Sequence, residues 1–348
     1  MNEVEPACPA PAKGGGGVTL AHGAGGRLTH RLVEEVFLRR FPDPALLEAH
    51  DGAVLSCGVE RVAFTTDSFV VRPLFFPGGD IGTLAVCGTA NDLAMCGAEP
   101  LFLSCAVILE EGFPLAELDR VAASLARAAG AAGLRLVTGD TKVVERGKGD
   151  GVYVTTSGLG RVAAPRPVRP AEVRPGDAIV LSGDVGRHAA AILSVREGLA
   201  FDTRVRSDCA CVWPQVRGLL DAGVTPRCLR DLTRGGLATA LNEVAQAAKV
   251  GLRVDEDAVP VEREVAAAAE LFGLDPLYMA CEGRFAAFVP PEQAQAARDA
   301  LARLAPGQAP AVIGEARAAQ PGEVRLRGRL GVERMLDMLS GEQLPRIC

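Results

Sequence analysis

The sequence has few aromatic residues, little net charge and no long hydrophobic run. Aromatics make up 4% of the 348 residues, and 37 Lys and Arg nearly balance 43 Asp and Glu, which leaves a net charge of −6. This balance argues against nucleic acid or an anionic membrane surface as the main partner. The best candidate for a membrane-spanning run, Leu84–Leu109, is interrupted by Asp92, Glu99 and Pro100. We therefore expect no nucleic-acid partner and no membrane partner.

The ten cysteines are scattered unevenly and lack the spacing of a disulfide framework. The N-terminal stretch Met1–Lys13 carries Glu3 and Glu5 and no basic segment, so a secretory signal is not expected. Hydrophobic residues account for 48% of the chain, which is enough for sizeable buried cores and excludes disorder throughout. We expect a soluble, cytoplasmic protein with reduced thiols and, given its length, two domains.

Glycine and proline runs suggest where the domains begin and end. Four prolines fall between Ala163 and Pro175, a stiff stretch suited to a domain boundary. Strand and helix patterns alternate on both sides of it, which predicts an α+β or α/β fold. The expected organisation is a flexible Gly-rich N-terminus (1–17), an N-terminal domain (18–162), a Pro-rich linker (163–175), a C-terminal α/β domain (176–330) and a mobile tail (331–348).

Hydrophobic periodicity and capping residues predict the elements that would position a site. Thr29 would begin one helix, and Asp80 would begin a longer one. The predicted elements are a helix at Thr29–Arg40, a strand at Arg61–Thr66 ending before Asp67, helices at Asp80–Cys96 and Leu115–Ala129, and a buried strand at Leu134–Thr138.

Four aspartates lie at the ends of predicted strands or in Gly-flanked turns: Asp67, Asp92, Asp140 and Asp231. Mg²⁺ prefers a few carboxylates together with phosphate oxygens, so convergent aspartates suit a metal–nucleotide site. The alternative for any one of them is an aspartate that caps a turn. Four together, three with adjacent Ser or Thr, favour a functional site.

Glycine-rich segments offer candidate phosphate sites. Gly14–Gly17 and His22–Gly26 have backbone N–H groups that could wrap phosphates, although a plain linker is the alternative. Neither is a Walker A sequence, because no Gly-Lys-Ser/Thr follows. Gly235 and Gly236 begin a predicted helix just after Asp231, which is a better anion site. Lys142 could supply a point charge to a phosphate, or could simply be solvated.

Cys348 is the last residue of an extended, Pro-containing tail, so its thiol is expected to be exposed and mobile. The tail from Ser340 would span about 30 Å if extended. The alternative is an untethered terminus with no role.

Several strings and the C-terminal tetrapeptide together resemble the HypE family of carbamoyl dehydratases, which act in NiFe-hydrogenase maturation. The resemblance runs from about Val18 to Cys348, and its most specific element is the terminal Pro-Arg-Ile-Cys. It implies a two-domain fold like that of aminoimidazole ribonucleotide synthetase, whose relatives bind ATP with Mg²⁺ and usually dimerise through their N-terminal domains. The matching strings are Thr65–Val71, Phe75–Gly82, Gly88–Leu93, Gly139–Val144, Asp231–Gly236 and Pro345–Cys348.

The resemblance also implies an activity. A HypF-type carbamoyltransferase would place a carbamoyl group on the Cys348 sulfur, and ATP-dependent dehydration would convert the S-carboxamide to an S-cyanide. The cyanide would go to iron on a HypC–HypD scaffold complex, for the iron of NiFe hydrogenase.

The same resemblance assigns roles to residues. Glu282, kept ionised by Arg284, would be the general base, and Lys142 would steady the developing charge. The remaining assignments are Asp67, Asp92, Asp140 and Asp231 as Mg²⁺ ligands, and Asn91, Thr141, Gly235, Gly236, Gly25 and Gly26 as ATP-binding residues.

Two features depart from the family pattern: the extension Met1–Lys13 with Cys8, and Cys281 beside the proposed base. Another ATP-using enzyme of the superfamily is one alternative. A selenophosphate synthetase-like enzyme would need a cysteine inside the Gly-rich loop, and none interrupts Gly14–Gly17. A thiamine-monophosphate kinase would not need the tail thiol. A non-catalytic thiol carrier is the alternative from another class, and the set of four aspartates argues against it.

Overall fold

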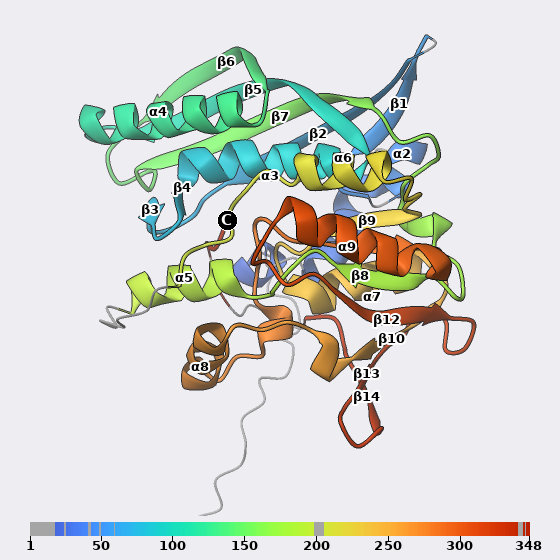
Figure 1. The fold of residues 1–348 in the computed structure, drawn as a ribbon. Coiled ribbons are helices and arrows are strands. Elements are labelled where there is room, and N and C mark those ends of the chain that lie inside the picture. The colour runs from blue at the N-terminus through green and yellow to red at the C-terminus, as the bar shows by residue number, and fades with distance from the viewer. Residues whose placement is uncertain are drawn as a thin grey trace, which may run out of the picture.

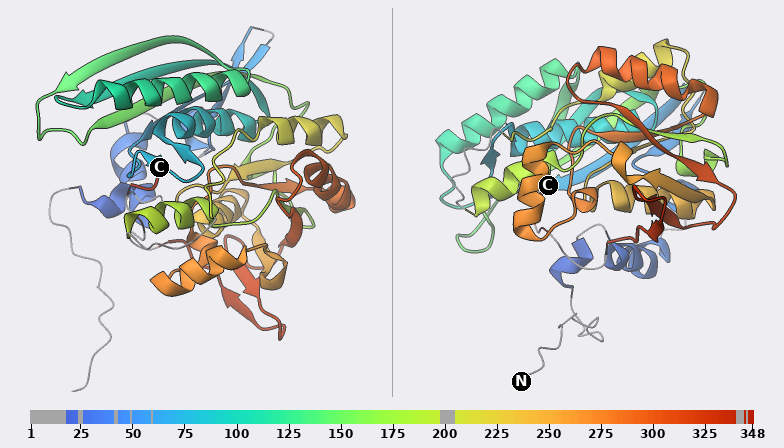
Figure 2. Two further views of the ribbon diagram at one scale, coloured as in Figure 1. Left: turned by 60° about the vertical axis from the view of Figure 1, so that its left-hand side comes forward. Right: turned by 60° about the horizontal axis from the view of Figure 1, so that its bottom comes forward.

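A computed structural model describes residues 18–23, 26–40, 43–48, 50–58, 60–197, 205–339, 344 and 346–348. The predictions for residues 1–17, including Cys8, and for Gly25 lie outside these residues. The described chain forms two layered units, each built on its own sheet, with the C-terminus lying between them (Figures 1 and 2).

The N-terminal unit is a five-stranded sheet in the order β1-β2-β7-β5-β6. Its neighbouring strands are antiparallel except for the parallel pair β5 and β6. Two helices pack on one face, and β6 lies at an edge (Figure 1). The elements are β1 (Ala53–Cys57), β2 (Glu60–Phe69), β5 (Ala98–Glu110), β6 (Arg135–Val144), β7 (Val152–Val162), α3 (Ile81–Met95) and α4 (Leu115–Ala131).

Helix α3 is the element that brings the two units together. As predicted, Asp80 caps it, because the Asp80 carboxylate accepts the N–H of Thr83 at 2.8 Å. Small and apolar residues occupy nearly every position, so α3 is buried on all sides. One side contacts β2 and β7, while the other meets β9 and α6 of the C-terminal unit.

The C-terminal unit is a seven-stranded sheet in the order β14-β13-β10-β12-β8-β11-β9. Side chains alternate along β8: Ile179 and Leu181 enter the core under α7, while Ala178 and Val180 enter the core under α6 and α9. Helices therefore cover both faces. The elements are β8 (Ala178–Leu181), β9 (Cys228–Asp231), β10 (Gly251–Asp255), β11 (Phe285–Val289), β12 (Ala311–Arg317), β13 (Val324–Arg327), β14 (Glu333–Met335), α5 (Arg187–Arg196), α6 (Trp213–Asp221), α7 (Gly236–Ala248), α8 (Arg263–Phe272) and α9 (Ala294–Leu304).

Shorter elements lie before and between the main helices and strands. A two-stranded hairpin precedes α3, and helical turns border the sheets. They are η1 (Leu20–Gly23), α1 (Arg27–Leu32), the π-helical turn η2 (Val33–Leu38), α2 (Pro44–Leu47), β3 (Phe75–Phe76), β4 (Gly79–Asp80), η3 (Pro170–Glu172), η4 (Glu256–Ala258), η5 (Pro276–Tyr278) and η6 (Pro291–Gln293). No helix in the described part of the chain is long and apolar enough to cross a membrane.

Apart from β2, which extends past its predicted end at Thr66 to Phe69, two predicted elements differ from the structure. The first helix starts at Arg27, ahead of the predicted cap Thr29, because Arg27 N–H donates to the Leu339 carbonyl and fixes the chain there. The predicted buried strand at Leu134–Thr138 is an exposed edge strand that continues through Asp140 to Val144. For the helix, a contact distant in the sequence outweighs the local pattern. For the strand, the cause is its place at the sheet edge, where it has only one neighbouring strand.

Candidate active site

A cavity of about 240 Å³ lies between the two units and collects acidic groups from both. Asp67 comes from β2, Asp92 from α3 and Asp231 from the end of β9, while Glu282 and Cys348 complete its lining. Three of the four predicted aspartates therefore share one cavity with the terminal thiol.

Strand alternation directs Asp67 toward this cavity. The strand β2 continues past the predicted end at Thr66 to Phe69, so Thr65, Asp67 and Phe69 point to the same side. Thr65 Oγ1 donates to Asp92 Oδ2 at 2.8 Å, which ties α3 to this side of the strand. Asp67 thus lies inside a strand and not at its end.

The aspartates raise one another's pKa values. Burial raises the pKa of Asp92 and of Asp231 well above the usual range, and the negative charges of Asp51 and Asp67 raise both further. Burial also raises the pKa of Asp67, although the guanidinium of Arg234 opposes that shift. Carboxylates held this close together repel one another, which favours the binding of a cation between them.

Asp51 belongs to this group although the sequence analysis did not single it out. Burial raises its pKa to about 6 despite the opposing charge of Arg230, whose Nη1 lies 2.5 Å from Asp51 Oδ1. Arg230 is also paired with Glu243. Asp51 precedes Gly52 just before β1, so the same Gly-flanked pattern that selected the other aspartates could have found it.

The donor set suits Mg²⁺ together with phosphate. Among the described residues, no three His, Cys, Asp or Glu side chains already stand in a metal-binding arrangement. Mg²⁺, however, commonly binds through one or two carboxylates, with phosphate oxygens and water completing its octahedral shell. The clustered oxygen ligands of Asp67, Asp92, Asp231 and Asp51 fit that mode.

Asp140, Thr141 and Lys142 lie apart from this cavity in edge strand β6. Asp140 pairs with Ala106 and Ala106 with Thr155, while Thr155 in turn pairs with Ser68. Paired residues share a face of the sheet, so Asp140 points to the side opposite Asp67.

The prediction that four aspartates converge is therefore wrong within one copy of the chain. The Lys142 Nζ lies 2.6 Å from Asp140 Oδ2, with both side chains more than half exposed. Within one copy, Lys142 is also not placed to steady charge at Cys348.

The terminal thiol is buried, whereas the sequence analysis expected it to be exposed. Cys348 is 7% exposed, and its Sγ lies 3.5 Å from Nη1 of Arg234. Burial raises the pKa of the Cys348 thiol to about 12, with Glu282 and Asp67 adding to the effect and Arg234 opposing it. In this position the sulfur is a protonated thiol in contact with a guanidinium.

Glu282 presents an unsatisfied carboxyl group to the same cavity. Its side chain is buried, and Oε1 has no hydrogen-bond partner. Burial raises its pKa well above the usual range, as do the nearby carboxylates, among them Asp231. The predicted partner Arg284 is instead paired with Asp184 at 2.8 Å, so the nearby cation that opposes the shift is Arg234.

Asn91 supports the site and is not free to bind a nucleotide. Its Nδ2 donates to the carbonyls of Ala210 at 3.0 Å and Glu282 at 3.2 Å. Its Oδ1 accepts the N–H of Val212 at 2.9 Å. The predicted ATP contact is therefore corrected: Asn91 holds the backbone of Glu282 in place.

The predicted glycines have different surroundings. Gly236 lines the cavity at the start of α7 with φ +58°, and a Cβ there would lie 2.7 Å from the Leu277 carbonyl oxygen. Gly235 precedes it with φ +79°, so the pair allows a helix N-terminus to reach the cavity. Gly26 instead packs against the Leu339 carbonyl, outside the cavity lining.

Cys281, for which the sequence analysis found no role, is a core residue. It is fully buried, and its Sγ accepts the N–H of Gly186 at 3.1 Å. All the cysteines that the structure describes are free. The thiol that faces the reactive groups is thus Cys348.

Comparison with known proteins identifies the family. The AIR synthase related protein family matches twice, with its N-terminal domain over residues 49–162 and its C-terminal domain over 174–327. The carbamoyl dehydratase HypE of Rhodobacter capsulatus is 51% identical over 334 residues, covering 95% of this chain and 98% of that protein. The chain belongs to the HypE family of carbamoyl dehydratases. Membership in the HypE family confirms the prediction of an enzyme.

Solved HypE structures share the fold. The chain superposes on HypE in a HypE–HypF complex with a TM-score of 0.84, at 40% identity and over 88% of this chain and 99% of that one. It superposes on HypE in complex with ATP with a TM-score of 0.80, at 46% identity and over 94% and 99% of the two chains. The two-domain fold that the sequence resemblance implied is confirmed.

Proposed function

We propose that this chain uses ATP to dehydrate an S-carboxamide on Cys348 to an S-cyanide, which becomes the cyanide ligand of iron in NiFe hydrogenase. The observation that carries the proposal is the position of the C-terminal thiol, which lies in one cavity with an unpartnered buried Glu282 and a set of aspartates. A chain terminus placed among such groups is suited to be a substrate held at its own active site.

The chemistry explains why these groups occur together. The carboxamide oxygen is a poor leaving group, so it first attacks the γ-phosphorus of ATP; ADP leaves, and the nitrogen gives up the first of its two protons to a base. The nitrogen then loses its remaining proton as the C–O bond breaks, which releases phosphate and leaves the C≡N triple bond on sulfur. Glu282 is the proposed base for the nitrogen protons, because its buried carboxyl group lines the same cavity as the Cys348 sulfur and its Oε1 has no hydrogen-bond partner. Arg234, 3.5 Å from the sulfur, is placed to balance negative charge on the oxygen, the role first assigned to Lys142.

Asp67, Asp92, Asp231 and Asp51 are the proposed Mg²⁺ ligands, and the metal would supply charge neutralisation for the triphosphate. Gly235 would offer its backbone N–H to a phosphate at the N-terminus of α7, whereas the N–H of Gly236 donates to the Thr233 carbonyl at 2.9 Å. The solved HypE bound to ATP supports ATP as the nucleotide.

Cys348 must leave the cavity to be loaded. At 7% exposure its sulfur is out of reach of a macromolecule, so the tail would dock at a partner for loading and return for dehydration. A HypF-type carbamoyltransferase is the proposed loading partner, which the solved HypE–HypF complex supports. A HypC–HypD scaffold complex is the proposed acceptor of the cyanide.

We further propose a homodimer through the N-terminal sheet. Phe64 on β2 and Ile108 on β5 are 46% and 42% exposed on the face opposite α3 and α4, and Asp140, Thr141 and Lys142 lie in the same sheet. Pairing of this face between copies would bury the apolar side chains. Sedimentation velocity at micromolar concentration should show a dimer, and a monomer would exclude this arrangement.

Intact mass spectrometry tests the proposed function. After incubation with a HypF-type carbamoyltransferase and its substrates, the chain should gain the mass of one carbamoyl group. Addition of Mg-ATP should then remove the mass of one water, whereas a non-hydrolysable ATP analogue should not. A loaded chain that keeps its mass with Mg-ATP would exclude the proposed dehydration.

The metal assignment predicts a selective loss of Mg-ATP affinity. Asp67→Asn or Asp92→Asn should weaken Mg-ATP binding about tenfold or more, since each removes a charged ligand worth at least 1.4 kcal/mol. ATP binding without Mg²⁺ should not weaken, because the same change relieves repulsion between carboxylates and triphosphate. Both variants should still be loaded at Cys348.

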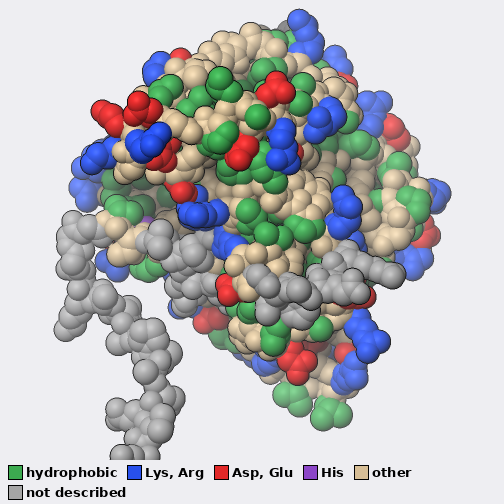
Figure 3. All heavy atoms as spheres, turned by 90° about the vertical axis from the view of Figure 1, so that its left-hand side faces the viewer, with side chains coloured by type: hydrophobic (Ala, Val, Ile, Leu, Met, Phe, Trp, Pro, Cys, Tyr) green, Lys and Arg blue, Asp and Glu red, His purple; other side chains and the backbone are tan. Residues whose placement is uncertain are grey.

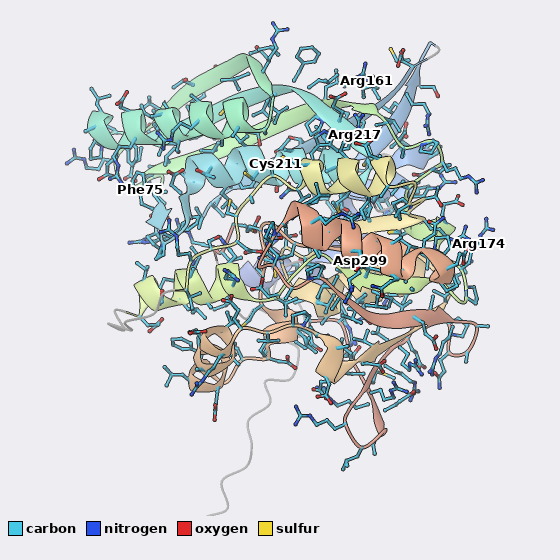
Figure 4. The ribbon with its side chains drawn as sticks, viewed as in Figure 1. Phe75, Arg161, Arg174, Cys211, Arg217 and Asp299 are labelled. Carbon is cyan, nitrogen blue, oxygen red and sulfur yellow. The ribbon has the colours of Figure 1, made fainter. Side chains whose placement is uncertain are left out.

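Isothermal calorimetry with and without Mg²⁺ measures this difference. Asp299→Asn is the matched control, because Asp299 lies on α9 away from the cavity and pairs with its neighbour Arg298 (Figure 4). Unchanged Mg-ATP affinity in both cavity variants would remove Asp67 and Asp92 from the metal site.

A further inference from the structure

The last three residues lie alongside the chain segment that follows β2 and bind to it through the main chain. The N–H of Val70 donates to a C-terminal carboxylate oxygen of Cys348 at 3.2 Å, and the N–H of Arg72 donates to the Arg346 carbonyl at 3.1 Å. Alternate residues pair in opposite order, which is antiparallel pairing. Main-chain hydrogen bonds between two chain segments are a common source of affinity when a protein binds a peptide.

Helix α5 supplies a histidine that recognises the tail. His188 Nε2 lies 2.8 Å from the Ile347 carbonyl oxygen, and Nδ1 lies 2.7 Å from Ser207 Oγ. A carbonyl only accepts, so Nε2 carries the proton and Nδ1 accepts from the Ser207 hydroxyl. His188 is fully buried with its edge against the ring of Phe76, which fixes its orientation.

Arg196, at the other end of α5, connects the tail to the segment that follows β2. Its Nε donates to the Arg72 carbonyl at 2.6 Å, and its Nη2 donates to the carbonyl of Arg346. Between them, His188 and Arg196 contact two successive tail carbonyls. These contacts recognise the main chain and are indifferent to the side chain of Ile347.

The side chain of Arg346 adds selectivity. Its guanidinium pairs with Asp150, and its Nε donates to the Val70 carbonyl at 3.2 Å. A cavity of about 400 Å³ lies beside Arg346. Phe75, which Figure 4 labels, also lines this cavity. Figure 3 faces this side of the molecule and shows acidic and basic side chains next to one another on its surface.

All of these contacts are non-covalent, so a separate peptide of the same sequence could make them as well as the chain's own tail. We propose that Val70–Arg72, Asp150, His188 and Arg196 form a peptide-binding subsite, separate from the reaction cavity, that takes the C-terminal Arg-Ile-Cys of a second copy as well as the chain's own. Asp150 selects arginine two residues before the terminal cysteine, and the main-chain contacts direct the cysteine into the cavity.

Peptide binding tests the subsite without any chemistry. The host is the full-length chain carrying Arg346→Ala and Cys348→Ala, whose own tail competes weakly. A fluorescein-labelled peptide of residues 344–348, kept reduced, should bind this host about tenfold tighter than the same peptide with Arg346→Ala, as expected for loss of a charge-assisted contact.

Asp150→Asn in the host should remove this preference while leaving binding of the alanine peptide unchanged, an effect that general destabilisation would not produce. Equal affinity of the two peptides, or no binding of either at millimolar concentration, would overturn the proposal. Thermal melting of each host verifies that it is folded.

Mixing two variants tests presentation to another copy, and this part rests on the proposed function. A Glu282→Gln chain loaded with the carbamoyl group is mixed with the host, which retains Glu282. With Mg-ATP, the Glu282→Gln chain should lose the mass of one water at a rate proportional to host concentration. A host that also carries Glu282→Gln is the control and should give no loss.

The outcomes separate the two ideas. If the wild-type chain dehydrates its own tail but the mixture does not react, presentation between copies is wrong and the proposed function stands. If the loaded wild-type chain also keeps its mass, the proposed function is wrong, and the peptide-binding result alone decides the subsite.

Discussion

Cys348→Ala is expected to abolish carbamoyl loading while leaving the fold and Mg-ATP binding intact. The structure places this thiol in the cavity with Glu282 and the aspartates, and removal of its sulfur removes the acceptor atom. The lost burial of one sulfur at a chain end should lower the free energy of unfolding by about 1 kcal/mol. Intact mass spectrometry after incubation with the carbamoyltransferase measures loading, and thermal melting measures stability.

Cys57→Ala is the matched control, because Cys57 is exposed at the end of β1 and away from the cavity. It should load like the wild type. If the Cys348→Ala chain still gains the mass of a carbamoyl group, the acceptor is another residue and the proposed role of the tail is wrong.

Glu282→Gln should load and bind Mg-ATP normally but stall before the thiocyanate. Loss of the nitrogen protons requires a base, and glutamine cannot accept them, so dehydration should slow by about 10²- to 10⁴-fold, the usual contribution of general base catalysis. Glutamine keeps the size of the side chain, and the contacts of Asn91 and Asp208 with the backbone at Glu282 remain. The variant should therefore fold and accumulate the carbamoylated species.

Single-turnover mass spectrometry after addition of Mg-ATP measures this stall. Glu262→Gln is the control, since Glu262 pairs with Arg187 outside the cavity and its side chain is 39% exposed. Dehydration of Glu282→Gln at the wild-type rate would assign the proton to another group of the cavity, with Asp67 as the next candidate.

Local sequence signals predicted the elements that carry the site. The Asp80 cap and the apolar run after it predicted α3, and the pattern of aspartates at predicted strand ends or in Gly-flanked turns pointed to Asp67, Asp92 and Asp231. These signals are local, because a cap or a turn depends on neighbours within a few residues. The same pattern also selected Asp140, which the sheet directs to its opposite face. A Gly-flanked aspartate reveals a turn or strand end but not the face on which it lies.

Partners far apart in the sequence could not be predicted in this way. Arg284 was the expected partner of Glu282 because it is two residues away, yet in the structure it pairs with Asp184. Arg234 is the cation that faces both Glu282 and Cys348, and it lies in the turn between β9 and α7, far from both in the sequence. Asn91 was expected at the nucleotide and instead bonds to the backbone of Glu282.

The sequence by itself determined the family and the two-domain fold and led to the proposal that Cys348 is the reactive terminus, because these depend on motifs and composition along the chain. Only the tertiary structure decided where that thiol lies, which carboxylates surround it and that Asp140 and Lys142 stand apart within one copy. The reason is physical. Burial and charge at Cys348 arise where α3, β9 and the tail meet, and residues distant in the sequence, with Val70 and Arg72 bonded to the tail, bring these groups together.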